Sequence, residues 1–176
     1  MTTDSDARET LHSWAIYLRA GEEARRRGDR RVGTEHLVLA LLEDPAIEAV
    51  LGTTRQRARE ALESLDHEAL GAVGLASGTD APLLPTRDVA KTPRIRDIAR
   101  KGRLPMTPAA KQVLEHASKS NRRRLYLTAE QVLVQILTLR PPDPAAVLLD
   151  VLDVDASELW RRLSSATESL VPKGTR

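Results

Sequence analysis

Apolar side chains recur three or four residues apart along the first part of the chain, which is the spacing of an amphipathic α-helix. Turn and cap residues divide this pattern: Gly28 and Gly52 end helical segments, and Asp44 before a proline opens one. The pattern predicts four helices, from Thr10 to about Ala24, from Gly33 to Leu42, from Pro45 to Leu51, and from Thr54 through Leu65.

The same succession returns between residues 107 and 170. Thr107 precedes a first-turn proline, and Thr128 with Gln131 has the spacing of a capping box. Asp143 and Asp155 then open two further predicted helices. The chain therefore reads as a tandem repeat of one four-helix unit, whose copies are expected to pack their apolar faces about a pseudo-twofold axis.

The predicted fold class is all-α, with about eight helices in two four-helix repeats. The predicted divisions are an N-terminal tail over 1–9, repeat one over 10–70, a connector over 71–105, repeat two over 106–170 and a C-terminal tail over 171–176. Both repeats are expected to form one domain. The connector is basic and holds several prolines and glycines, and a short helix is predicted over residues 94–99.

Composition agrees with a helical core of small aliphatic side chains. Hydrophobic residues make up 41% of the 176 positions, but aromatic residues only 2%, and Phe is absent. Trp14 and Trp160 lie on the apolar stripes of the first and last predicted helices, so we expect both in the core. The chain has no Cys, which excludes disulfides, thiol nucleophiles and Cys-based zinc sites.

The stretch Gly33-Thr34-Glu35-His36-Leu37, with Ala24 and Gly28 before it, resembles the N-terminal domain of Clp-family AAA+ unfoldases, ClpC most of all. A second, more divergent match is Leu127-Thr128-Ala129-Glu130-Gln131. Asp29 stands where the family usually has His. The resemblance implies a double-repeat domain that receives substrates and adaptors and does no chemistry.

In ClpC-type domains the opening Thr and the motif Glu of each repeat line a shallow pocket for phosphoarginine. Carried over to this sequence, these pairs are Thr10 with Glu35, and Thr107 with Glu130. The chemistry is reasonable, because a carboxylate accepts guanidinium N–H groups and a phosphate prefers helix N-terminal N–H groups.

The aromatic residue that the family places before each opening Thr is replaced by Glu9 and Met106. The aromatic surfaces with which the family binds cyclic-peptide antibiotics are therefore not conventional in this chain.

Several function classes lack their motifs. There is no G-x-x-x-x-G-K-[ST] phosphate loop, no G-x-S-x-G and no H-E-x-x-H, so we expect no ATPase, no catalytic residue, no cofactor and no metal site. The N-terminus is polar and no apolar run approaches the ~20 residues of a membrane helix, which predicts a cytoplasmic protein without a membrane partner.

The sequence thus predicts a stand-alone, non-catalytic protein- or peptide-binding module, an adaptor, decoy or regulator in Clp-dependent proteolysis. The expected partners are Clp ATPases, protease substrates or adaptors, with phosphoarginine or Clp-targeting cyclic peptides as ligands. The alternative is a nucleic-acid-associated helical regulator that uses the basic connector, especially Arg87 to Arg103. A net charge of +2 is too small to demand such a partner.

Overall fold

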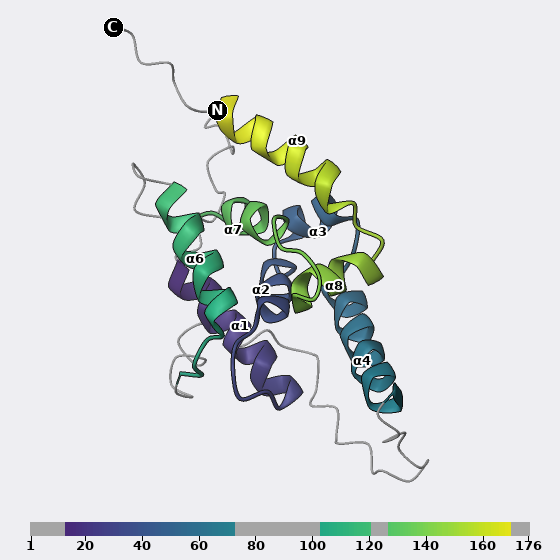
Figure 1. Ribbon diagram of the computed structural model, residues 1–176. Helices are drawn as coiled ribbons and strands as arrows, with labels where there is room; N and C mark the ends of the chain where they lie inside the picture. Colours follow the sequence, from purple (N-terminus) through teal and green to yellow (C-terminus); the bar gives the residue numbers. More distant parts are fainter. Residues whose placement is uncertain (1–12, 73–102, 121–126, 170–176) are drawn as a thin grey trace, which may run out of the picture.

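The computed structural model describes residues 13–72, 103–120 and 127–169. Within these ranges the chain forms eight helices and no strand, which confirms the predicted all-α class. Four helices lie before residue 73 and four after residue 102, so the described chain has the two-part order that the sequence predicts (Figure 1).

The first helical repeat consists of α1 (Ser13–Arg27), α2 (Thr34–Leu41), α3 (Pro45–Leu51) and α4 (Arg55–Ala72). The second consists of α6 (Pro108–Ser120), α7 (Ala129–Ile136), α8 (Pro144–Val151) and α9 (Ala156–Ser169). The predicted start of the first helix at Thr10 and the short helix over 94–99 lie outside the described residues.

Equivalent turns in the two repeats use the same local chemistry. The Asp44 carboxylate accepts the backbone N–H two residues on at 2.8 Å, and Asp143 does the same at 3.0 Å. Gly52 and Asp153, which follow the next short helices, both have left-handed backbone, with φ of 65° and 59°. These matching caps fix the ends of α3 and α8.

One hydrophobic core runs through both repeats. Helix α2 lies at the centre and packs against α1, α6, α7 and α8, while α1 and α6 lie along one edge of the molecule (Figure 1). The largest fully buried side chains come from both repeats: Ile16, Leu37, Leu39, Leu41, Leu42, Ile47, Leu133, Ile136, Leu137, Leu148 and Leu149. The two repeats therefore share their core.

The expectation that both tryptophans belong to the core is wrong. Trp14 on α1 and Trp160 on α9 are each 41% exposed. Both helices pack at the edge of the bundle, where only the middle of an apolar stripe is covered: Leu159, directly before Trp160, is 8% exposed.

None of the described helices combines the length and hydropathy needed to cross a membrane.

Candidate functional site

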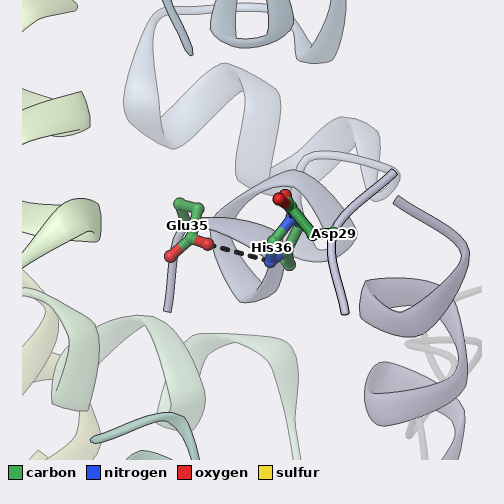
Figure 2. A group of neighbouring side chains, drawn as sticks. All are labelled: Asp29, Glu35 and His36. Atoms are coloured by element: carbon green, nitrogen blue, oxygen red, sulfur yellow. Dashed lines mark hydrogen bonds and ion pairs between the residues drawn. The ribbon is translucent and has the colours of Figure 1, made fainter. Parts of the chain in front are cut away.

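The start of α2 is built around a buried histidine. The Nδ1 of His36 accepts the backbone N–H of Gly33 at 3.0 Å, which completes the first turn as the third residue of a capping box does. Its Nε2 lies 2.9 Å from the Oδ2 of Asp29, which is drawn beside it in Figure 2. His36 is only 1% exposed. The Asp29 carboxylate in turn accepts from the Nε of Arg27 at 3.0 Å. The Asp at position 29 therefore holds the imidazole in place.

Glu35 folds back over the same turn. Its carboxylate lies directly over Gly33: a Cβ added there would come within 2.3 Å of Oε1, so a larger residue at position 33 would require the Glu35 side chain to move. Oε1 lies 3.0 Å from the Nδ1 of His36 (Figure 2), and Oε2 is buried with no hydrogen-bond partner among the described residues. The carboxylate therefore keeps one acceptor oxygen that no donor fills in the described part of the chain.

The pKa of Glu35 lies below its usual value of 4.5. Burial raises this pKa, but the hydrogen bond and positive charge of His36, the backbone N–H of Glu35 itself and the positive charge of Arg27 lower it by more. Glu35 is therefore an ionised carboxylate at neutral pH. Such a group is suited to bind a cationic donor.

Asp29, Glu35 and His36 bring possible metal-ligand atoms within 4.8 Å of one another. Their arrangement is nevertheless that of a helix cap. Asp29 contacts Nε2 of His36, and Glu35 contacts Nδ1 on the other side of the ring. A metal ion bound to either ring nitrogen would therefore have only one of the two carboxylates next to it. Both ring nitrogens already take part in hydrogen bonds, and one of them holds the Gly33 N–H. The expectation of no metal ligand at these residues stands as a prediction.

Thr107 joins the second helical repeat to the loop before α2. Its hydroxyl accepts the backbone N–H of Ala110 at 3.2 Å and so caps α6. Its own N–H donates to the carbonyl of Val32 at 2.9 Å, and the N–H of Val32 donates to the carbonyl of Pro105 at 2.9 Å. This short parallel bridge places Thr107 beside the segment that leads into Glu35.

The two other expected site residues, Glu130 and Thr10, are distant in sequence from the cluster of Asp29, Glu35 and His36. Glu130 is in the first turn of α7, where Thr128 and Gln131 form the predicted capping box. Thr10 lies outside the described residues. The pairing of Thr10 with Glu35 and that of Thr107 with Glu130 both stay predictions.

A groove of about 900 Å³ runs between α1 and α6 and is lined in part by the segment that leads to Thr107. The groove has an apolar floor and a charged rim. The residues that line it are Trp14, Tyr17, Arg103, Leu104, Pro105, Met106, Lys111, Leu114, Glu115, Ser118 and Lys119. The Tyr17 hydroxyl donates to the carbonyl of Leu104 at 2.5 Å and fixes the segment before α6 against α1.

Sequence reasoning missed this groove. The available signal was the apolar run Leu104-Pro105-Met106 directly before the Thr107 cap, since apolar residues outside a helix need a partner surface. Trp14 supplies that surface from α1, and the guanidinium of Arg103 lies 4.3 Å from the centre of the Trp14 ring. A tryptophan assigned to the core thus belongs to an exposed groove.

Comparisons with known proteins agree with this architecture. The family described as the Clp repeat (R) N-terminal domain matches residues 8–151. Among solved structures, the N-terminal domain of the caseinolytic protease associated chaperone ClpD from Arabidopsis thaliana has a similar fold. It has a TM-score of 0.56 and 22% sequence identity, and the alignment covers 94% of this chain and 99% of that one. A comparison with curated protein sequences gives no match. On the extent of the family match, the chain belongs to the Clp N-terminal domain family.

Proposed function

We propose that this protein is a non-catalytic module that receives segments of other proteins and acts as an adaptor, decoy or regulator in Clp-dependent proteolysis. Membership of the Clp N-terminal domain family supports a Clp-related protein-binding module, since domains of this family bind substrates and adaptors. The particular role in proteolysis is the part that needs a test.

We further propose that Glu35 contacts an arginine group, phosphorylated or free, on the bound segment. The observation that carries this is the Oε2 of Glu35, which is buried without a partner on an ionised carboxylate. A guanidinium offers the N–H donors that this carboxylate lacks. To meet a ligand, the Glu35 side chain would rotate away from Gly33 and exchange its contact with His36 for one with the guanidinium, while Nδ1 of His36 keeps its hydrogen bond from the Gly33 N–H.

The phosphate of phosphoarginine needs donors of its own, and helix N-termini supply them. The opening threonines flank such ends: Thr107 caps α6 and lies beside the segment that leads to Glu35. In this proposal Thr10 and Glu35 form one pocket, and Thr107 and Glu130 form a second. The second belongs to the more divergent repeat.

Calorimetry with phosphoarginine, free arginine and a phosphoarginine peptide tests the pocket. We expect wild type to bind, and Glu35→Ala to bind about tenfold or more weakly, because a hydrogen bond to a charged group contributes about 1.5–3 kcal/mol. Glu63→Ala, an exposed glutamate on α4, is the matched control and should bind like wild type. Absence of binding by wild type would remove the arginine pocket and leave the fold unchanged.

A reconstituted degradation assay separates the roles. Purified Clp ATPase and protease digest a phosphoarginine-marked substrate with increasing amounts of this protein. An adaptor raises the rate, whereas a decoy lowers it in proportion to the substrate that it holds. A Glu35→Ala protein that acts like wild type would show that arginine recognition plays no part in the effect.

A Clp-targeting cyclic peptide is a second candidate ligand, favoured by the apolar floor of the groove between α1 and α6. Titration of such a peptide against the tryptophan fluorescence of wild type and Trp14→Ala tests it directly.

A nucleic-acid role rests on the basic connector, most of which lies outside the described residues. Binding to a phosphate backbone would weaken steeply with added salt, whereas contact with one phosphoarginine would weaken far less.

A further inference from the structure

We infer that the groove between α1 and α6 selects segments of partner proteins in which acidic side chains flank apolar ones. The inference rests on the proposed function as a protein-binding module, but it does not depend on Glu35. It concerns which segments the groove accepts, and two features carry it: an apolar floor and a basic rim.

The floor is apolar and open. Trp14 is 41% exposed, and Leu104, Met106 and Leu114 are half-buried around it. A groove of about 900 Å³ lies within the range of about 300–1,000 Å³ that ligand sites occupy, so it suits a short segment rather than a whole domain face. Exposed tryptophan beside aliphatic side chains is typical of a surface that contributes binding energy.

The rim carries more positive than negative charge. Among the described residues, Arg103, Lys111 and Lys119 line the groove, against Glu115 as the single acidic one. Lys111 and Glu115 lie 3.6 Å apart, but their side chains are 70% and 49% exposed, so this pair is weak and a partner carboxylate can replace it. Within the described part of the chain, Arg103 and Lys119 have no ion pair with an acidic side chain.

Arg103 combines both features. Its guanidinium lies 4.3 Å from the centre of the Trp14 ring, so the stacking holds a positive charge at the edge of the apolar floor. The edge of a stacked guanidinium still offers N–H groups to a carboxylate. A segment with an apolar side chain on the floor and an adjacent Asp or Glu would meet Trp14 and Arg103 together.

A second copy of this chain is the occupant that the experiment has to separate. The region around the α8–α9 turn exposes acidic and apolar side chains together: Asp150, Val151, Asp153, Asp155, Glu158 and Trp160. It has the chemistry that the groove is inferred to select. In Figure 1 this region and the α1–α6 edge lie on different sides of the molecule, so such pairing would be head-to-tail.

Fluorescence anisotropy with a short labelled peptide of Leu and Glu residues tests the inference. The same peptide with Gln or with Lys in place of Glu is the matched comparison. We expect the order of affinity Glu, then Gln, then Lys, and we expect added salt to narrow these differences. Equal binding of the Glu and Lys peptides would overturn the inference.

Protein variants locate the effect. Lys111→Glu with Lys119→Glu should weaken binding of the Glu peptide about tenfold, since two attractive charge contacts are replaced by two repulsive ones. Arg57→Glu, at an exposed basic residue on α4, should have no effect. Trp14→Ala should weaken all three peptides, while Trp160→Ala, equally exposed on α9, should not. Circular dichroism checks that each variant keeps its helices.

Sedimentation of the chain alone completes the design. Self-association that Trp14→Ala abolishes, and that competes with the Glu peptide, would assign the groove to a second copy and overturn the inference. A chain that stays monomeric while it binds the peptide supports it. Loss of phosphoarginine binding in calorimetry leaves these results untouched, so failure of the arginine proposal and failure of this one are distinguishable.

Discussion

The starts of α2 and α7 occupy equivalent places in the two repeats, yet they are stabilised differently. At α7 the cap is local: the Thr128 hydroxyl accepts the N–H of Gln131 at 3.3 Å, and the Gln131 side chain accepts the N–H of Thr128 at 3.1 Å. At α2 the cap residue is Gly33, which has no side chain, and His36 supplies the returning acceptor.

The start of α2 is instead connected to distant parts of the chain. His36 reaches the preceding turn through Asp29, and the hydroxyl of the buried Thr34 donates to the Asp143 carboxylate of the second repeat at 2.7 Å. The position equivalent to Thr34 is Ala129, which has no hydroxyl to donate. The comparison shows that the Gly-Thr-Glu-His motif is a point of tertiary attachment as well as a helix start.

The largest expected difference between the two starts comes from their third helical residues. His36→Ala leaves a cavity and an unpaired Gly33 N–H at a buried site, and should lower the free energy of unfolding by about 3 kcal/mol. Gln131→Ala removes a cap bond in a less buried turn and should cost about 1 kcal/mol. Urea unfolding followed by circular dichroism measures both. Equal losses would mean that the two starts are equivalent after all.

A smaller difference is expected at the residues that carry the cap hydroxyls. Thr34→Val keeps the side-chain volume but removes the donor to Asp143, and should cost about 1–2 kcal/mol of unfolding free energy. Thr128→Val should cost about 1 kcal/mol, since only a local cap is lost. A double variant with Asp143→Asn sharpens the result. If Thr34→Val lowers the unfolding free energy equally with and without Asp143→Asn, the hydrogen bond between the two repeats is not the cause of that loss.

The smallest effect concerns pH. Because the pKa of folded Glu35 lies below 4.5, its ionised form contributes stability that is fully present above pH 4.5 and is lost as the pH falls through the folded pKa. We expect the unfolding free energies of wild type and Glu35→Gln to differ most at neutral pH and to converge in acid. Glu63→Gln on the exposed face of α4 should show no such convergence.

Local patterns predicted most of the described fold. Asp44 with Pro45, Thr54, Thr107 and the Thr128 box all act within a few residues of themselves, and each lies where its pattern places it. Of the candidate site, the sequence identified Glu35 through a family resemblance. It did not reveal that the carboxylate rests on Gly33 with one oxygen unpartnered, since this depends on how Arg27, Asp29 and His36 converge.

By itself, then, the sequence determined the order of the described helices, most of their caps and the repeat, because these follow from interactions between residues a few positions apart. Its motif also indicated the family. The fourth helix extends to Ala72, beyond the predicted Leu65. The tertiary structure decided where the edges of the shared core fall, and therefore that Trp14 lies in an exposed groove beside Arg103. It also decided that Met106 pairs with Val32 and that the N–H of Thr107 donates to the Val32 carbonyl. Such contacts join residues distant in sequence, and only the packing of all the helices brings them together.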